Sequence, residues 1–388
     1  VVDRATSGIL ALNTHDTAAK ATAIEADLAA GRTPENSTDG AADRVVQFQD
    51  DVSDADREAA KLEWYLHDGE YWDQPGPDHR VISQQEASDL AEAQKEKNVA
   101  VGTSTSFLPG SVFKLVTATA AIQAGVSPPE LGAELELPPD DPLKNEWGGP
   151  CPGPGIAEML TYSCNTAAGW IGLQVGAAGL TDAAVVLGLT DEDILAGPPD
   201  LTNGPEPIAL AYSNFNTVGL DGVATPSDSV LARSAIGQEN VRTTVPGLAV
   251  LGQSIMSGER RPLTFIHGWC KNGDVTVWQS PATKIEGIDF EPIRAGMAGA
   301  VERGTATDLA SVGVVAAKTG TAESVGAEGQ LQNDSTLVAV TNDLIIVIRV
   351  APTEENPLPV TGEGGAVDVA AGLLPLPRAS VANPCQGH

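Results

Sequence analysis

Ser111 and Lys114 lie three residues apart in a sequence that could activate a serine hydroxyl. The stretch "LPGSVFKLVTATAAIQAG" (108–125) is apolar and predicts a buried helix that ends at Gly125. Side chains three positions apart share one face of a helix, so the serine and the lysine can be in contact. Burial lowers the pKa of a lysine, and a neutral amine beside a hydroxyl can make that hydroxyl a nucleophile. The alternative is a capping serine beside a lysine that extends to the surface.

A second polar group, Ser163 with Asn165, interrupts a helical stretch. The sequence "GIAEMLTYSCNTAAGWIGLQVGAAGL" (155–180) predicts two helices that break near Ser163. A turned backbone at this break can direct both polar side chains into one cleft. Taken alone, the group could equally be a polar turn between two helices.

A third polar group, Lys318-Thr319-Gly320-Thr321, lies on a strand expected at 312–323. Gly320 has no side chain that would keep the backbone of a ligand away. Its neighbours offer one positive charge and two hydroxyls. A strand end without a function is the alternative for these four residues alone. The three groups in this order are a more specific signal than any one of them.

The set resembles the SxxK, SxN and KTG motifs in the transpeptidase domain of class B penicillin-binding proteins, of an actinobacterial kind. The similarity continues in "IGQENVRTTVPGLAVLGQSI" (236–255) and "VERGTA" (301–306), and good matches span about 105 to 325. Three features depart from the family pattern. Glu239 stands in place of the second glycine of Gly-Gln-Gly, "SDADREAAKLEWYL" (53–66) looks helical where the family has a strand pair, and "STLVAV" (335–340) lacks an aromatic pair.

The resemblance implies acyl transfer from a peptidoglycan stem peptide that ends in D-Ala-D-Ala. Ser111 would attack the carbonyl of the penultimate D-Ala, with Lys114 as the general base. Ser163 and Asn165 would relay the proton to the leaving amine and hold the peptide. Lys318 would supply positive potential.

The remaining site residues follow from the same resemblance. Thr319 and Thr321 would bind the terminal carboxylate of the substrate, with Gly320 between them. The oxyanion would lie between the backbone N–H groups of Ser111 and Thr321. β-Lactams would acylate Ser111 covalently, and the chemistry needs no cofactor and no metal.

Several other functions share these motifs. A D,D-carboxypeptidase differs only in using water as the acyl acceptor, and the motifs do not choose between the two. A serine β-lactamase needs a device that activates a deacylating water, but no Glu-x-x-Leu-Asn occurs between the second and third motifs. The third alternative is an inactive β-lactam sensor or structural homologue. The presence of Lys114, Asn165 and Lys318 argues against it.

The elements that must position these residues give an α/β (α+β) fold. The resemblance and the strand-rich ends indicate an antiparallel sheet built from the N- and C-terminal segments, flanked by helices, with a mostly helical insert. The whole chain, 1–388, is expected to be one transpeptidase domain with parts 1–105, 106–300 and 301–388. Expected strands lie at 8–16, 44–49, 275–280, 312–323, 335–341 and 344–350. Expected helices lie at 17–31, 53–66, 83–97, 108–125, 155–180, 181–189, 244–261, 292–304 and 365–374, and expected loops at 32–43, 67–79, 126–155 and 195–230.

Composition limits the partners. The 388 residues include 52 acidic and 22 basic side chains, a formal net charge of −30 that would repel nucleic acid. Apolar residues make up 42%, enough for a sizeable core. No run of 18 apolar residues occurs and the first ten residues are not a signal peptide, so we expect any anchor to be absent from this chain. The resemblance implies the extracytoplasmic face of the cell membrane, with cell-division or elongation proteins as possible partners.

The four cysteines favour structural disulfides over a metal site. They show no CxxC spacing, and the five histidines do not cluster. In an oxidising compartment the preferred pairs are Cys151–Cys164 and Cys270–Cys385. Phe113 is expected in the core, and Trp147 and Trp170 are expected to pack rather than line a substrate site.

Overall fold

The computed structural model describes residues 2–3, 66–67, 70–72, 81–83, 107–138, 142–189, 227–239, 241–264, 268–271, 274–277, 279–325, 331–352 and 365–374. The chain divides into two compact units, one of 1–12 with 103–388 and one of 13–102. The expected elements at 8–16, 17–31, 32–43 and 44–49 lie outside the described residues, as does nearly all of those at 53–66 and 83–97.

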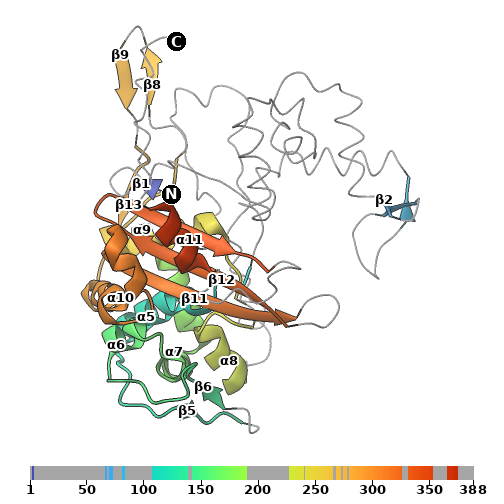
Figure 1. Ribbon diagram of the computed structural model, residues 1–388, viewed down its shortest axis with the longest axis vertical. Coiled ribbons are helices and arrows are strands. Elements are labelled where there is room, and N and C mark those ends of the chain that lie inside the picture. Colours follow the sequence, from blue (N-terminus) through green and yellow to red (C-terminus); the bar gives the residue numbers. More distant parts are fainter. Residues whose placement is uncertain are drawn as a thin grey trace. The chain divides into compact units, whose positions relative to one another are not determined.

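A four-stranded antiparallel sheet forms the centre of the first unit (Figure 1). Its strand order is β1 (Val2–Asp3), β13 (Leu344–Val350), β12 (Leu331–Val340) and β11 (Ala316–Val325). Val2 lies opposite Ile345, so residues from the two ends of the chain share this sheet. The predicted fold class, a terminal sheet with helices and a helical insert, is confirmed.

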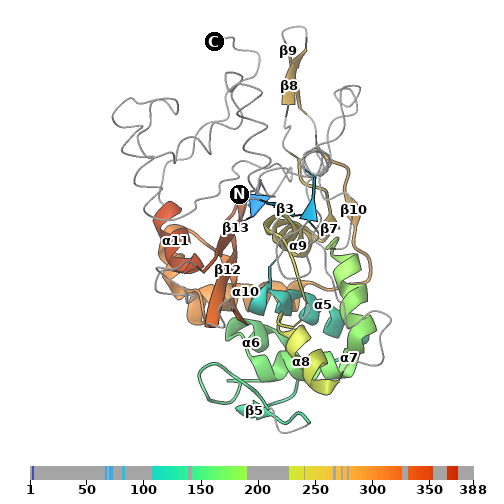
Figure 2. The same cartoon turned by 90° about the vertical axis from the view of Figure 1, so that its right-hand side faces the viewer.

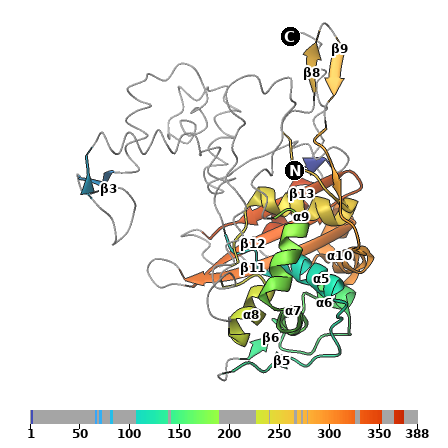
Figure 3. The same cartoon turned by 180° about the vertical axis from the view of Figure 1, so that it is seen from behind.

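Side chains alternate between the two faces of the sheet, and each face has its own core. On β12, Val338 and Val340 face one core, which includes residues of α9 (Val245–Ser257). Leu337 and Ala339 face the other core, which includes residues of α11 (Ala366–Leu373). Figure 2 shows the sheet between α9 and α11, and Figure 3 shows α9, α5 and α7 from behind.

Helices make up the insert on the α9 side. The 3-10 helix η2 (Gly110–Phe113) leads into α5 (Lys114–Ala124), which ends at Gly125 in a left-handed conformation, as predicted. The short helix α6 (Ile156–Thr161) precedes α7 (Asn165–Val186), and the predicted break near Ser163 is confirmed. By length and composition α7 could cross a membrane, but it packs against α5 and α8 (Asp228–Ala235).

Three other helices of the first unit match the sequence analysis within a few residues: α10 (Glu291–Arg303), and α9 and α11 given above. The 3-10 helix η4 (Thr307–Val312) was not predicted. Strand β11 begins at Ala316 rather than 312, because η4 occupies the earlier residues and Gly313 turns the chain with φ 84°. A turn at 341–343 joins β12 to β13, and Thr341 Oγ1 accepts there from the backbone N–H groups of Asp343 and Leu344.

Three expected loops prove wrong in part. The 126–155 segment contains the two-stranded sheet β5 (Glu134–Leu135) and β6 (Leu143–Lys144), and helix α8 begins inside the expected 195–230 loop. In the second unit, β2 (Leu66–His67), β3 (Glu70–Trp72) and β4 (Val81–Ile82) pair where a loop was expected at 67–79. These strands are two or three residues long, too short for a periodic pattern to reveal them. The remaining pairs are β8 (Gly268–Lys271) with β9 (Asp274–Val277), and β7 (Glu259–Arg260) with β10 (Thr283–Lys284).

Candidate active site

Ser111 lies in η2, and the residues before it are anchored on both sides. The Pro109 carbonyl accepts a hydrogen bond from Thr336 Oγ1 at 3.0 Å, which ties η2 to β12. Gly110 has φ 53°, and a Cβ at this position would collide with the carbonyl of Thr321 on β11. The Gly110 N–H donates to the Gly237 carbonyl at 3.0 Å. Gly110, in the "LPG" before the serine, therefore allows η2 to approach β11 more closely than a residue with a side chain would permit.

Lys114 reaches Ser111 as the spacing predicted, with 2.9 Å between Nζ and Oγ. The lysine is the first residue of α5 and is fully buried. Nζ also lies 2.6 Å from the Ser163 carbonyl and 2.6 Å from Asn165 Oδ1, and 3.2 Å from Ser163 Oγ. The expectation that this lysine is buried rather than extended to the surface is confirmed.

The surroundings of Lys114 favour a neutral amine. Burial lowers its pKa well below the ordinary lysine value, the nearby Lys318 lowers it further, and Glu146 acts in the opposite direction. A neutral amine has two N–H groups and one lone pair. The Ser163 carbonyl and Asn165 Oδ1 accept the two N–H groups, which leaves the lone pair for the Ser111 hydroxyl. This arrangement can remove the proton from Ser111.

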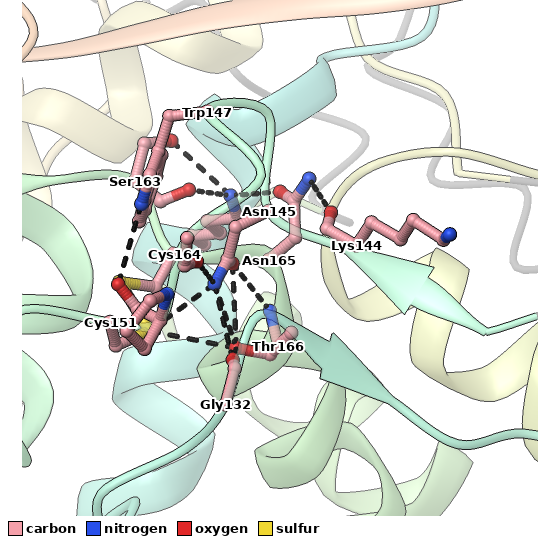
Figure 4. Close-up of a disulfide and its surroundings, with 12 residues drawn as sticks. Gly132, Lys144, Asn145, Trp147, Cys151, Ser163, Cys164, Asn165 and Thr166 are labelled. Carbon is pink, nitrogen blue, oxygen red and sulfur yellow. Dashed lines mark hydrogen bonds between the residues drawn. A yellow bond between two sulfur atoms is a disulfide. The ribbon is translucent and has the colours of Figure 1, made fainter.

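Ser163 lies between α6 and α7 in a left-handed conformation, with φ 57°. Such a conformation is costly for a residue other than glycine and is kept where the surrounding structure enforces it. It turns the carbonyl and the hydroxyl of Ser163 toward Lys114. The next residue, Cys164, is fully buried and forms a disulfide with Cys151, with 5.8 Å between the Cα atoms (Figure 4). The predicted Cys151–Cys164 pair is confirmed, and the other predicted pair lies outside the described residues because it includes Cys385.

Asn165 begins α7 and is oriented from its other side. Its Nδ2 donates to the Lys144 carbonyl on β6 at 2.8 Å, which leaves Oδ1 facing Lys114 (Figure 4). Sequence reasoning did not find this backbone contact. It comes from a two-residue strand, and a carbonyl leaves no signal in residue types.

Lys318, on β11, is fully buried and links the third motif to the other two. Its Nζ donates to Ser163 Oγ at 2.9 Å and to the Thr319 carbonyl at 2.8 Å. Burial lowers the pKa of Lys318 to about 7, although Glu146 raises it in part. Ser163 Oγ thus lies within hydrogen-bonding distance of both lysines, and a proton can pass between the three groups.

The three residues after Lys318 differ in their surroundings. Thr319 is buried, and its hydroxyl donates to the hydroxyl of Thr305 at 2.8 Å, whereas Thr321 is partly exposed. A Cβ on Gly320 would lie 2.7 Å from the Pro109 carbonyl and would collide with Thr336 Oγ1. The close approach that requires a glycine here is therefore the packing of β11 against η2. Sequence reasoning had attributed it to a ligand and had missed Thr305.

The loop before the SxN motif corrects the expectation for one tryptophan. Trp147 is 45% exposed rather than packed inside, and its Nε1 donates to the Pro150 carbonyl at 3.3 Å. Trp170 packs against the core as expected, and Phe113 is buried as expected. Glu146 is also exposed, although it affects the pKa of both site lysines. Neither exposed residue had been singled out for a role in the site.

Comparison with known proteins is consistent with this geometry. A family model, the penicillin-binding protein transpeptidase domain, matches residues 78–364. The peptidoglycan D,D-transpeptidase PbpA of Mycobacterium tuberculosis is 30% identical over 182 residues, which cover 44% of this chain and 33% of the relative. PbpA of Mycolicibacterium smegmatis is 31% identical over 232 residues, which cover 57% of this chain and 44% of the relative. The aligned parts thus span less than half the length of these curated relatives.

Solved structures show the same fold at lower identity. The ceftriaxone acyl-enzyme of penicillin-binding protein A from M. tuberculosis matches with a TM-score of 0.54 and 23% identity, over 74% of this chain and 65% of that one. Penicillin-binding protein 3 from the same organism, in complex with aztreonam, matches with a TM-score of 0.54 and 21% identity, over 73% of this chain and 65% of that one.

Proposed function

The chain belongs to the penicillin-binding protein transpeptidase family, of the class B, actinobacterial kind, and we propose that it is a serine D,D-transpeptidase that crosslinks peptidoglycan. One observation carries the proposal. The Lys114 amine, with its lowered pKa, lies 2.9 Å from Ser111 Oγ while two acceptors hold its other bonding directions. A serine so placed is a ready nucleophile for an acyl group.

The acylation step follows the contacts from Ser111 to Lys114 and from Lys114 to Ser163. Ser111 Oγ attacks the carbonyl of the penultimate D-Ala of a stem peptide, and Lys114 Nζ accepts the hydroxyl proton. Ser163 Oγ, within 3.2 Å of that amine, passes a proton to the nitrogen of the leaving D-Ala. The C–N bond breaks and an ester to Ser111 remains. Asn165 holds the lysine and the peptide during this step.

The substrate's carboxylate and oxyanion are bound from β11. The hydroxyls of Thr319 and Thr321 donate to the terminal carboxylate, and the Thr319 hydroxyl then accepts from the Thr305 hydroxyl instead of donating to it. The backbone N–H groups of Ser111 and Thr321 stabilise the oxyanion, each donor by a factor of roughly 100 to 1000 in rate. Lys318 adds positive potential when it is protonated.

The cellular setting follows the relatives. PbpA of M. tuberculosis is a peptidoglycan D,D-transpeptidase, so this chain would act on the extracytoplasmic face of the membrane. Penicillin-binding protein A of that organism forms acyl-enzymes with penicillin G and imipenem, so β-lactams would acylate Ser111 here. Another similar structure belongs to a peptidoglycan synthase complex, which supports partners from the division or elongation machinery.

Intact mass after exposure to penicillin tests the function. The mass should increase by one drug molecule, peptide mapping should place the adduct on Ser111, and Ser111→Ala should abolish it. The adduct should persist for many minutes to hours. Rapid repeated hydrolysis of the drug would instead identify a β-lactamase, and no adduct on a folded protein would identify an inactive homologue. With a D-alanyl donor, release of free acid in the presence of amines would favour a carboxypeptidase.

A further inference from the structure

The loop from Lys144 to Cys151 is fixed against the SxN segment at three points. The Lys144 carbonyl accepts from Asn165 at 2.8 Å, and Asn145 Oδ1 accepts from the Thr166 N–H at 3.0 Å. The disulfide joins the end of the loop to Cys164 (Figure 4). The residues between these points therefore have a defined position beside the catalytic group.

Two side chains of this fixed loop are exposed, Glu146 and Trp147. The indole is held by its hydrogen bond to the Pro150 carbonyl, and a Cβ on Gly149 would lie 2.9 Å from the indole ring. Glu146 makes no ion pair with any residue that the structure describes, and its charge acts on both Lys114 and Lys318. The packing of the loop does not require an exposed, hydrogen-bonded indole next to a carboxylate that has no ion pair among the described residues.

The proposed acylation step defines the path of the acceptor amine. In the proposed acylation, the leaving amine departs past Ser163, which gives it a proton. The acceptor amine must reach the same carbonyl by the reverse path, since deacylation by an amine is the reverse reaction with a different amine. The two residues that follow Ser163, Cys164 and Asn165, are both bonded to the loop that carries Glu146 and Trp147.

We propose that Glu146 and Trp147 form a docking site for the acceptor's ammonium group, an inference that rests on the proposed transpeptidase function. A carboxylate and the face of an indole are the two protein groups that attract an alkylammonium ion. The docked ammonium releases one proton to solvent. The neutral amine then attacks the acyl carbon, the C–N bond forms as the bond to Ser111 Oγ breaks, and a second proton of the amine returns to Oγ through Lys114.

The test measures how one acyl-enzyme divides between amine and water. The full chain is acylated with a D-alanyl thioester, and amide and free acid are quantified in the presence of glycinamide, a largely protonated amine at pH 7, or methoxyamine, a neutral one. Glu146→Gln should lower the amide-to-acid ratio about threefold to fivefold with glycinamide and by much less with methoxyamine. Trp147→Ala should lower the ratio with glycinamide about twofold to fivefold, and Trp147→Phe should restore most of it. Glu136→Gln, which removes an exposed carboxylate elsewhere in the same region, is the matched control.

Each other outcome has a distinct meaning. Equal losses with the two amines, or an equal loss in Glu136→Gln, would overturn the docking site in favour of a general effect on the loop or on charge. Slower acylation with an unaltered amide-to-acid ratio would show that Glu146 and Trp147 act on the donor substrate. This result would also overturn the docking site. Failure of the wild-type protein to form any acyl-enzyme would overturn the proposed function itself, and the docking site with it.

Discussion

Lys114 and Lys318 share the hydroxyl of Ser163, so the charge on one affects the charge on the other. Nζ of Lys114 lies 3.2 Å from this oxygen and Nζ of Lys318 lies 2.9 Å from it. Lys318 lowers the pKa of Lys114, and burial lowers the pKa of both. Lys114 is therefore neutral to the greatest extent while Lys318 is charged. This division gives the two lysines opposite roles, one as proton acceptor and one as positive potential.

The rate of Ser111 acylation by penicillin should therefore depend on pH in a bell-shaped manner. Below the pKa of Lys114 the base is protonated and the rate falls as the pH is lowered. Above about 7, the pKa of Lys318, the positive charge that attracts the drug's carboxylate is lost and the rate falls again. The second-order rate constant, measured from acid to alkaline pH, reports these groups in the free enzyme as values that belong to the coupled pair.

A second acylating reagent distinguishes the acid limb of this pH profile from its alkaline limb. A D-alanyl thioester without a carboxylate at the corresponding position should keep the acid limb and lose most of the alkaline one. Lys114→Ala should slow acylation about 100- to 10,000-fold at the pH where the wild-type rate is highest, and should remove the acid limb. A rate that is constant across neutral pH, or an alkaline limb of equal size for both reagents, would contradict these assignments.

At this scale the sequence predicted the residues that carry distinctive side chains. The contact between Ser111 and Lys114 follows from their spacing, and the break between helices predicts that Ser163 points into a cleft. The contacts of Ser163 with both lysines are seen only in the structure. The carbonyl of Lys144 and the hydroxyl of Thr305 could not be found this way. The first is a backbone group and the second is an ordinary residue after a helix, and only the fold brings them to the site.

Among the elements, the junction of α6 and α7 concentrates the strain of the site. Ser163 has a left-handed backbone, and Cys164 beside it is tied to Cys151 across a sequence separation of 13 residues. A cross-link that closes a loop of this size constrains the unfolded chain by about 3 kcal/mol in the entropy model. The same bond fixes the residue that follows Ser163, so it connects stability to the geometry of the proton path.

Removing this disulfide should affect both properties. The double variant Cys151→Ala, Cys164→Ala should unfold with a free energy about 3 kcal/mol lower in denaturant titrations. Its acylation by penicillin should also slow, because Ser163 can relax toward an ordinary conformation. Replacing Cys270 and Cys385, the other predicted pair, by alanine serves as the control for loss of a disulfide outside this junction. Wild-type stability in the double variant would show that packing alone determines this junction.

Glu239 has a left-handed backbone, with φ 59°. Among the described residues other than glycine, Ser163 is the other one with this conformation. The family pattern has a glycine here, and the structure supplies the physical reason. Glu239→Gly should relieve about 1–2 kcal/mol of strain and lose about 0.5–1 kcal/mol to the greater freedom of the unfolded chain, a net gain of about 0.5–1 kcal/mol. The Arg242 guanidinium donates to the backbone carbonyl of this residue, so that bond can remain.

Gly237→Ala is the matched comparison for this position. Its φ is 83°, and an added Cβ would collide with the Gly110 carbonyl and approach Phe113 Cβ to 2.9 Å. We expect a loss of about 2 kcal/mol or more, together with slower acylation of Ser111. Thermal unfolding of the two variants should move in opposite directions. A destabilised Glu239→Gly would show that the glutamate side chain contributes more than its backbone strain costs.

Prediction of whole elements succeeded where the pattern was long. Strand β13, with its continuous apolar run, and helices α9 and α10, with an N-cap or an early proline, lie within a few residues of their expected bounds. The start of β11 was wrong because "VGVV" at 312–315 reads as strand by composition, although Val312 ends η4 and Gly313 turns the chain. Short pairs such as β5 and β6 were missed because two residues cannot show a period.

At the scale of the whole molecule, every residue of the site belongs to the unit formed by 1–12 and 103–388. This unit also contains both cores of the sheet, and strand β1 enters it from the N-terminal segment. The family match begins at residue 78, within the other unit. A single domain over 1–388 stays a prediction, and the arrangement of the site suggests how to test it.

Replacing residues 13–102 with a flexible Gly/Ser linker should leave a protein that still forms the penicillin adduct on Ser111. The reason is that the anchors of η2, the lysine contacts and the disulfide all involve residues after 103, while β1 keeps its place beside β13. Intact mass after penicillin and the midpoint of thermal unfolding measure the two properties, and the same replacement carrying Ser111→Ala controls for nonspecific acylation. Loss of a cooperative unfolding transition would show instead that 13–102 completes the core, and that the chain folds as the single domain first expected. If the linker variant folds but is acylated far more slowly, residues 13–102 contribute to acylation itself.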